Sequence, residues 1–207
     1  MIEKKTATNA FYTILHRFNC SYDIRFKGKG NVWFTIIILT VFFLTSIFQR
    51  QNTGYIFNYN KLSDLNVFLQ FIGVMLPFVL FVISNWVVGI LMNGTGRFRD
   101  IWIYGAYCCI PFIMGNILSV LLSNVLVREE PFGGYVQVFG AAWSLVVLFI
   151  GLMIMHEYGF TQNVFSCICT LFVMFILLFL IMLVGNLATD LYGFVMTVVK
   201  EITFRMS

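Results

Sequence analysis

The sequence predicts an all-α integral membrane protein, a bundle of about five transmembrane helices joined by short loops. Hydrophobic residues make up 60% of its 207 positions and the mean hydropathy is +0.90, which is far above the values of soluble domains. Charged residues make up only 11% and gather between long uncharged windows. A spanning helix needs roughly 20 mainly apolar residues, and such windows recur along the whole chain. They leave no room for a separate soluble domain.

Five windows lack Lys, Arg, Asp and Glu and are long enough to cross a bilayer. They are residues 32–48, 66–92, 101–126, 135–156 and 164–187. The short segments between them carry turn-forming and charged residues, so consecutive spans should run antiparallel. We therefore divide the chain into a cytoplasmic basic entry segment (1–31), a transmembrane domain (32–199) and a tail (200–207).

The last apolar stretch is too long for one ordinary span and too short for two. Apolar residues continue beyond residue 187, through Asp190 and up to Val199. A charge inside the bilayer is costly, which places Asp190 near the membrane boundary. We predict a fifth span followed by a short interfacial or partly embedded helix.

The distribution of Lys and Arg predicts the orientation, because cytoplasmic loops carry an excess of both. With the N-terminus inside, eight basic residues fall on the cytoplasmic side: Lys4, Lys5, Arg17, Arg25, Lys27, Lys29, Arg97 and Arg99. The opposite side receives five: Arg50, Lys61, Arg128, Lys200 and Arg205. The N-terminus is therefore predicted to be cytoplasmic. The side of the C-terminus stays open, since the last stretch could fold back.

The entry segment has helical periodicity before the first span. Phe11, Ile14, Leu15 and Phe18 fall at positions i, i+3, i+4 and i+7. Such a face suits either an amphipathic helix in the membrane interface or a helix packed on the inner end of the bundle. The segment is not expected to be a secretory signal, because no small-residue cleavage site follows the apolar stretch.

The stretch "NWVVGILMNGTGRFRD", residues 85–100, contains a Gly-x-Gly sequence between two spans. It lacks the third glycine of a dinucleotide fingerprint and the Gly-Lys-Ser/Thr of a Walker loop. Gly94 and Gly96 are instead predicted to take the positive φ of a tight turn. Arg97 and Arg99 would then anchor the turn at anionic lipid, and Asp100 would start the next helix as a first-turn or N-cap residue.

No metal site, cofactor site or catalytic set can be assembled from the sequence. Cys167-x-Cys169 lacks a second ligand pair, and His156-Glu157 is not followed by the second histidine of a zinc motif, because position 160 is Phe. We interpret His156 as the end of a helix at the level of the lipid headgroups and Glu157 as solvated there. No nucleophile with a base and an orienting group stands out, so an enzyme is not expected.

A stripe of small and polar residues runs along one face of the third span. Its members have helical spacing and are Gly115, Asn116, Ser119 and Ser123. Such a stripe permits close helix packing, but it would also suit a partner helix or a polar solute path. Asn85 and Asn186 are candidates to join it, since an amide in hydrocarbon needs a partner. Pro77 and Pro111 lie inside their windows, where proline can kink a helix.

The region around the Gly-x-Gly turn resembles the central signature of the Yip family (Ypt/Rab-interacting proteins). The matching residues are Asn85, Trp86, Gly94, Gly96, Arg97, Ala106, Tyr107 and Pro111. The N-terminal "LHRFNCSYDIRFKGKGN" and the "HEY" at 156–158 are similar to segments of the family's bacterial members, although Phe18 stands where a proline would be expected nearby. The resemblance covers most of the chain.

The resemblance implies a five-span protein of a bacterial cytoplasmic membrane with no known catalytic centre. The longer cytosolic region of the Rab-associated eukaryotic relatives has no counterpart here, so Rab binding does not carry over. Some bacterial members accompany sugar import systems. We therefore favour a non-catalytic adaptor or accessory subunit, with a sugar ABC importer as one candidate system, over a carrier or permease component for a small solute. The expected partners are membrane lipids and a transporter subunit, without nucleic acid; self-association stays open.

Overall fold

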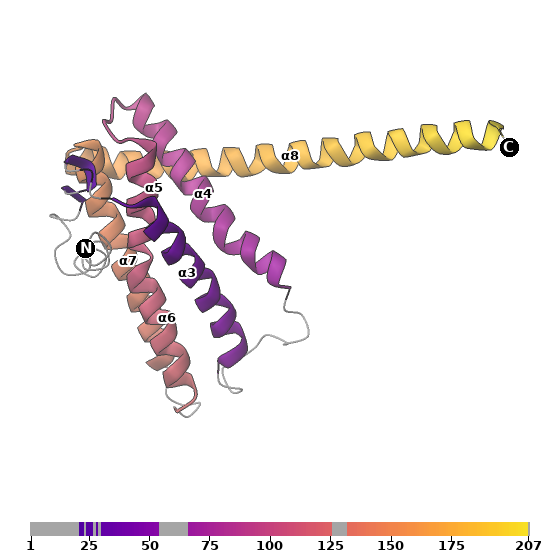
Figure 1. Ribbon diagram of the computed structural model, residues 1–207. Coiled ribbons are helices and arrows are strands. Elements are labelled where there is room, and N and C mark those ends of the chain that lie inside the picture. Colours follow the sequence, from indigo (N-terminus) through magenta and orange to yellow (C-terminus); the bar gives the residue numbers. More distant parts are fainter. Residues whose placement is uncertain are drawn as a thin grey trace.

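The computed structural model describes residues 21, 22, 24–26, 28, 30–53, 66–125 and 132–206, and within these residues every regular element is a helix (Figure 1). In chain order the helices are α3 (Val32–Asn52), α4 (Val67–Leu91), α5 (Phe98–Cys108), α6 (Ile110–Ser123), α7 (Phe132–His156) and α8 (Phe160–Met206).

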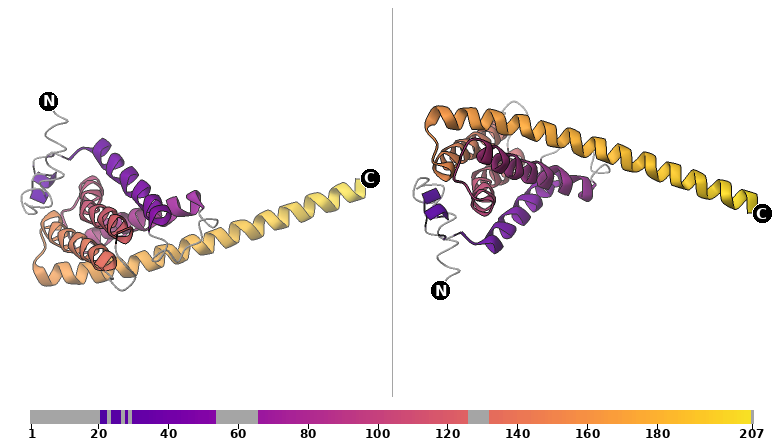
Figure 2. Two further views of the ribbon diagram at one scale, coloured as in Figure 1. Left: turned by 90° about the horizontal axis from the view of Figure 1, so that it is seen from below. Right: turned by 90° about the horizontal axis from the view of Figure 1, so that it is seen from above.

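Among the described residues, five segments are long and apolar enough to cross a membrane: α3, α4, α5 together with α6, α7, and α8. The all-α fold class and the number of five spans predicted from the sequence are therefore confirmed. The first four spans lie side by side in a bundle, whereas α8 crosses one end of that bundle and extends far beyond it (Figures 1 and 2). Hydropathy predicted which segments span the membrane, but it carries no information about the direction of α8 relative to the other spans.

The third span is interrupted at Cys109, two residues before Pro111. Proline has no N–H to donate and its ring clashes with the carbonyl four residues earlier, which breaks the helical ladder. The Cys109 N–H bonds instead to Ala106 O at 3.1 Å, in a tighter turn, and the regular ladder resumes when Ile113 N–H bonds to Cys109 O at 2.9 Å. Pro77 has a milder effect, because α4 continues through it.

Two asparagines start the first two spans. The Asn31 side chain accepts a hydrogen bond from Trp33 N at 3.0 Å, and Asn66 accepts from Phe68 N at 3.0 Å and from Leu69 N at 3.2 Å. Asparagine is a preferred N-cap because its side-chain oxygen satisfies amides that have no partner within the helix. The caps fix where α3 and α4 begin.

The core of the bundle lies around α5. Tyr104 is 1% exposed, and its hydroxyl donates to Val147 O of α7 at 2.8 Å. The ring lies directly on Gly151, where a methyl group would come within 1.8 Å of Tyr104 Cε1. Tyr107 packs edge-on against Phe34 of α3, with ring centres 5.9 Å apart. Aromatic residues of α5 thus join the first span to the fourth.

The prediction for the last apolar stretch was wrong in one respect, because the fifth span and the expected short helix form one unbroken helix. Helix α8 has 47 residues, which gives it a length of about 70 Å against roughly 30 Å for a hydrocarbon core. No proline follows Pro131, so nothing in this stretch removes a backbone donor and ends the helix. From Leu178 to Arg205 every residue of α8 is exposed.

The described arginines that precede α7 lie at the two ends of the bundle. Arg25 and Arg99 lie at the end where α5 begins, whereas Arg50 lies near the opposite end and donates to Gln70 Oε1 at 3.3 Å. The predicted amphipathic helix with Phe11, Ile14, Leu15 and Phe18 lies outside the described residues. The same holds for several of the basic residues counted for orientation: Lys4, Lys5, Arg17, Lys27, Lys29, Lys61 and Arg128.

Candidate functional site

The α4–α5 turn and the α7–α8 corner meet at one end of the bundle, and their contact is centred on the ring of His156. A methyl group on Gly89 would lie 2.5 Å from His156 Cε1, one on Gly94 2.5 Å from Nδ1, and one on Gly96 2.6 Å from Cε1. Side-chain carbons do not approach other heavy atoms so closely. The three glycines therefore let the backbone of α4 and its turn lie directly against the imidazole.

The predicted reason for Gly94 and Gly96 was wrong, because neither residue has a positive φ. Gly28 is the only glycine with a positive φ among the described residues, and in the turn it is Asn93 that is left-handed, with φ 56°. The Gly94 N–H bonds to Gly89 O at 2.7 Å, which completes a Schellman-type end to α4. The glycines provide space for His156, and asparagine provides the turn.

Helix α7 ends in the same way as α4. Glu157 has φ 59°, and the Tyr158 N–H bonds to Met153 O at 2.9 Å. Two Schellman-type ends therefore face each other: a methyl group on Gly94, which follows the first left-handed residue, would lie 2.4 Å from the hydroxyl of Tyr158, which follows the second. The Gly-x-Gly turn and the His-Glu-Tyr sequence are two halves of one contact.

A buried polar network runs from His156 across three helices. His156 is 2% and Asn85 1% exposed, and Nε2 of the histidine lies 2.9 Å from Asn85 Oδ1. Because that oxygen only accepts, Nε2 donates. Asn85 Nδ2 in turn donates to Thr170 Oγ1 at 3.3 Å, and this hydroxyl donates to Ser166 O at 2.8 Å. The network fastens the first turns of α8 to α4 and α7.

Two polar atoms in this contact are buried without a hydrogen-bond partner among the described residues, His156 Nδ1 and the Tyr158 hydroxyl oxygen. The two rings stack with their centres 5.1 Å apart and an angle of 13° between their planes. Burial raises the pKa of Tyr158, so the phenol keeps its proton at neutral pH. The phenol of Tyr158 is thus uncharged where it stacks on the His156 ring. This contact is one of packing and encloses no charge on the phenol.

Charged and polar groups cover the outer side of the same contact. The Thr95 hydroxyl donates to Glu157 Oε1 at 3.0 Å, which ties the turn to the corner. Arg25 donates to the Thr95 carbonyl and forms an ion pair with Asp100, with 3.4 Å between Nη1 and Oδ2. Arg99 donates to Gly30 O at 3.3 Å. The segment before α3 is thereby bound to the start of α5, and Asp100 lies in the first turn, as predicted.

A small cavity of about 90 Å³ lies between the segment before α3 and the start of α5. Its lining includes Arg25, Arg97, Arg99 and Asp100. It is a second polar feature at the end of the bundle where His156 lies.

The remaining residues of the predicted signature lie in the packed body. Trp86 is 37% exposed and meets Phe98 edge-on, with ring centres 5.8 Å apart, so it braces the two sides of the turn. Tyr107 is buried in the core, and Pro111 is buried at the start of α6. These three residues thus pack within the bundle and support the elements on which the contact around His156 is built.

The predicted stripe of the third span lies on α6 and faces α7. A methyl group on Gly115 would lie 3.0 Å from Gly140 Cα, and one on Gly133 would lie 3.3 Å from Ser119 O. Of the stripe, Gly115, Asn116 and Ser119 are buried, and Ser123 is half-buried.

The predicted extension of this stripe by two asparagines was wrong. Asn85 bonds to His156 and Thr170 instead, and Asn186 lies on the exposed part of α8.

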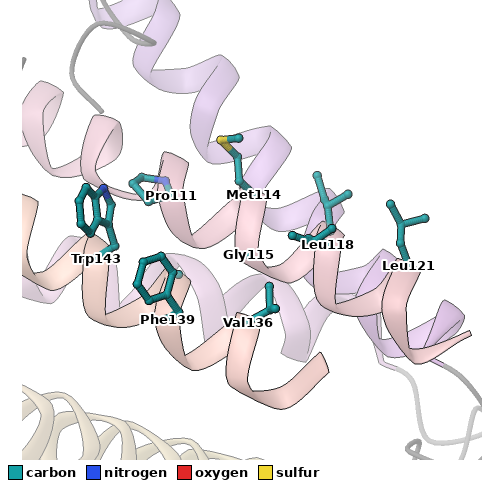
Figure 3. Close-up of a pocket in the computed structure, with 10 residues that line it drawn as sticks. Pro111, Met114, Gly115, Leu118, Leu121, Val136, Phe139 and Trp143 are labelled. Atoms are coloured by element: carbon teal, nitrogen blue, oxygen red, sulfur yellow. The ribbon is translucent and has the colours of Figure 1, made fainter. Parts of the chain in front are cut away.

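The close approach of α6 and α7 leaves an apolar groove of about 530 Å³ along their outer side (Figure 3). Its floor is the glycine contact, and Met114, Leu118, Phe139 and Trp143 stand along it. In a bilayer such a surface faces lipid tails. The lining of the groove is almost entirely apolar, and the indole of Trp143 contributes its one side-chain N–H.

No group of three or more His, Cys, Asp or Glu residues among the described residues could hold a metal ion. Cys108, Cys109, Cys167 and Cys169 are free thiols. His156 does end its helix, as predicted, but it is enclosed by protein instead of lying exposed at the headgroups.

The fold and the site define a multi-pass helical membrane protein whose α4–α5 turn packs on the end of its fourth span. A family model described as the Yip1 domain matches residues 19–183, which is most of the chain. The chain belongs to the Yip1 domain family, as its turn and "HEY" sequences predicted. No curated protein and no solved structure shows a significant match to it.

The central role of His156 and its partners Gly89, Tyr158 and Thr170 was not predicted from the sequence. The resemblance drew attention to the turn and to the "HEY" sequence separately, but nothing in the spacing indicated that segments more than 60 residues apart enclose one ring. One signal was present. An isolated histidine ends one apolar span, and a glycine-rich sequence ends another. The hypothesis that these glycines make room for the histidine ring would have paired the two segments.

Proposed function

We propose that this protein is a non-catalytic membrane adaptor or accessory subunit whose exposed helix α8 binds a transmembrane helix of another membrane protein. One observation carries the proposal. Gly185, Thr189, Gly193 and Thr197 recur every four residues along the exposed part of α8, and nothing lies within 4 Å of where a methyl group would stand on either glycine. Small residues at this spacing are the feature that lets membrane helices approach closely.

The threonines of this α8 stripe leave its surface free for a neighbour. The Thr189 hydroxyl donates to Gly185 O and the Thr197 hydroxyl to Gly193 O, both at 2.9 Å. Their hydrogen bonds are thus made within the helix. Asn186 and Asp190 lie one position after the first two members and so flank the face of the stripe. Polar groups in hydrocarbon favour partners that can bond to them.

The partner we favour is a subunit of a transport system, and a sugar ABC importer is one candidate. That candidate rests on the family resemblance alone. The alternative, a carrier that moves a small solute by itself, has less physical support, because the buried side chains of Asn85, His156 and Thr170 bond to one another and the lining of the large groove is mainly apolar.

Affinity purification from the native membrane in mild detergent, followed by mass spectrometry, tests this proposal. The unmodified protein should copurify with a membrane protein in stoichiometric amount, and the double variant Gly185→Leu, Gly193→Leu should lose it. Gly73→Leu is the matched control, since Gly73 of α4 also has nothing within 4 Å. Equal recovery of the partner with the double variant would contradict the role of α8. Solute uptake by the protein alone in vesicles would favour the carrier.

We also propose that the N-terminus and the α4–α5 turn face the cytoplasm of a bacterial cell. The clustering of Arg25, Arg97 and Arg99 at one end of the bundle supports this orientation. A cysteine at Thr95→Cys should resist an impermeant thiol reagent in intact cells and react after the membrane is opened. Rapid labelling in intact cells would reverse the orientation.

A further inference from the structure

The small cavity beside the start of α5 concentrates positive charge. Three of the residues that line it are arginines, Arg25, Arg97 and Arg99, and Asp100 is its one acidic residue. Asp100 is paired with Arg25, and both side chains are close to nine-tenths buried, with 12% and 11% exposed. Among the described residues that line the cavity, one carboxylate therefore accompanies three guanidinium groups, so their summed charge is positive.

Several donors of these arginines have no hydrogen-bond partner in the described part of the chain. A guanidinium carries five N–H donors. Arg25 directs its two terminal nitrogens to Asp100 and the Thr95 carbonyl, while its Nε is buried without a partner among the described residues. Arg97 is exposed and forms no hydrogen bond with them.

The backbone adds to the positive potential. Helix α5 begins at Phe98 without a side-chain cap, and the first backbone amide of the helix to bond is that of Asp100. The amides at a helix N-terminus carry a partial positive charge and attract anions, so cationic side chains there are disfavoured. Three arginines around such a terminus repel one another and the helix. An anion held among them would convert this repulsion into attraction.

The shape of the cavity limits the size of that anion. About 90 Å³ is the liquid volume of some three water molecules, at about 30 Å³ each, which is room for a phosphate-sized group and for little more. Gly30 forms part of its wall, and a methyl group there would lie 2.9 Å from Ile103 Cδ1. The geometry of guanidinium groups matches the paired oxygens of a phosphate.

We propose that this cavity binds the phosphate group of an anionic ligand through Arg97, Arg99 and the amides at the start of α5. Two sources share this chemistry, the headgroup of an anionic lipid and a soluble phosphate compound. Trp33, in the first turn of α3 at the same end of the bundle, is 76% exposed, and exposed tryptophans favour the membrane interface. The cavity thus lies where a lipid headgroup would be within reach.

The test uses the full chain in nanodiscs and measures its thermal unfolding. In one arm phosphatidylglycerol is titrated into phosphatidylcholine nanodiscs, and in the other inorganic phosphate is added at constant ionic strength, set with chloride. A ligand that binds only the folded state raises the melting temperature, and the rise grows with the ratio of ligand concentration to Kd. Stabilisation by phosphatidylglycerol alone identifies a lipid headgroup as the ligand, whereas stabilisation by inorganic phosphate identifies a soluble source.

The variant Arg97→Gln should weaken the apparent affinity about tenfold, the usual effect of losing one charged hydrogen bond. Arg205→Gln is the matched control, since it removes one exposed arginine from α8, where Arg205 bonds only to Glu201 at 2.9 Å. Should Arg97→Gln not fold, Arg97→Lys keeps the charge without the planar fork and should give a smaller loss. No stabilisation of the unmodified protein by either ligand, or equal losses in the Arg97 and Arg205 variants, would overturn the proposal.

Discussion

The α6–α7 pair and the exposed part of α8 carry the same kind of sequence and use it differently. Both have glycines and small hydroxyl residues on one helix face. Between α6 and α7 the glycines are in contact, since a methyl group on Gly140 would lie 3.0 Å from both Gly115 Cα and Pro111 O. On α8 the space beside Gly185 and Gly193 is open. A stripe of small residues therefore predicts that another helix can approach closely. Whether that helix comes from the same chain depends on the fold.

The largest expected effect is on the closed contact. Gly140→Leu places a branched side chain against the backbone of α6, which cannot move aside as a flexible side chain could, and should lower the free energy of unfolding by about 3 kcal/mol. Gly185→Leu should leave it unchanged, because nothing lies nearby. Chemical unfolding of both variants in detergent measures the difference. Equal destabilisation would mean that α8 packs on the bundle in the isolated protein.

A second closed contact is the one around His156, and Gly94 tests why it is glycine. Gly94→Val should destabilise the protein by about 2 kcal/mol, because the side chain would displace the rings of His156 and Tyr158. Gly159→Val, in the same corner, should have a smaller effect, since nothing lies within 4 Å of that position. Thermal unfolding of the pair gives the comparison. A tolerated Gly94→Val would show that the space around the imidazole is not needed.

These contacts also show how far the sequence predicts the fold. The five spans were predictable because a bilayer demands long uncharged segments, and the composition shows them directly. The end of the fifth was not, since stop signals depend on proline, glycine and capping residues. The stretch after 187 has only Gly193, which stays helical inside α8. The local sequence therefore did not indicate whether the helix would end or continue after residue 187.

The site was less predictable than the fold, for a different reason. The turn at residues 93–96 follows from local sequence, and a turn is there. Its glycines are required by the close approach of His156, which lies 60 residues further along the chain. The left-handed residue of the turn is Asn93. Long-range contacts leave no local pattern. The resemblance to a family covered both segments, but it gave no sign that they are in contact.

A smaller effect is expected where α8 leaves the bundle. Thr170→Val keeps the shape but removes the hydroxyl that accepts from Asn85 Nδ2, so a buried amide loses one partner. We expect a loss of about 1 kcal/mol in unfolding free energy. The direction of α8 relative to α4, measured by spin-label distances, should also become more variable. Thr189→Val, on the open part of α8, is the control and should change neither quantity.

The smallest effect separates helix packing from solute passage along the α6 stripe. Ser119 lies against Gly133 of α7, and the Ser123 hydroxyl donates to Val120 O of its own helix at 2.7 Å. Alanine preserves the close approach and removes only a hydroxyl, so Ser119→Ala and Ser123→Ala should each cost about 0.6 kcal/mol or less. Ser119→Leu should instead force α6 and α7 apart and reduce the yield of folded protein in detergent.

If the stripe lined a solute path, the alanine variants would stay folded and lose uptake of sugars in reconstituted vesicles, because polar lining groups are what such a path requires. Since the structure buries these residues between two helices, we expect near-silent alanine variants, and a folded variant without uptake would contradict the adaptor.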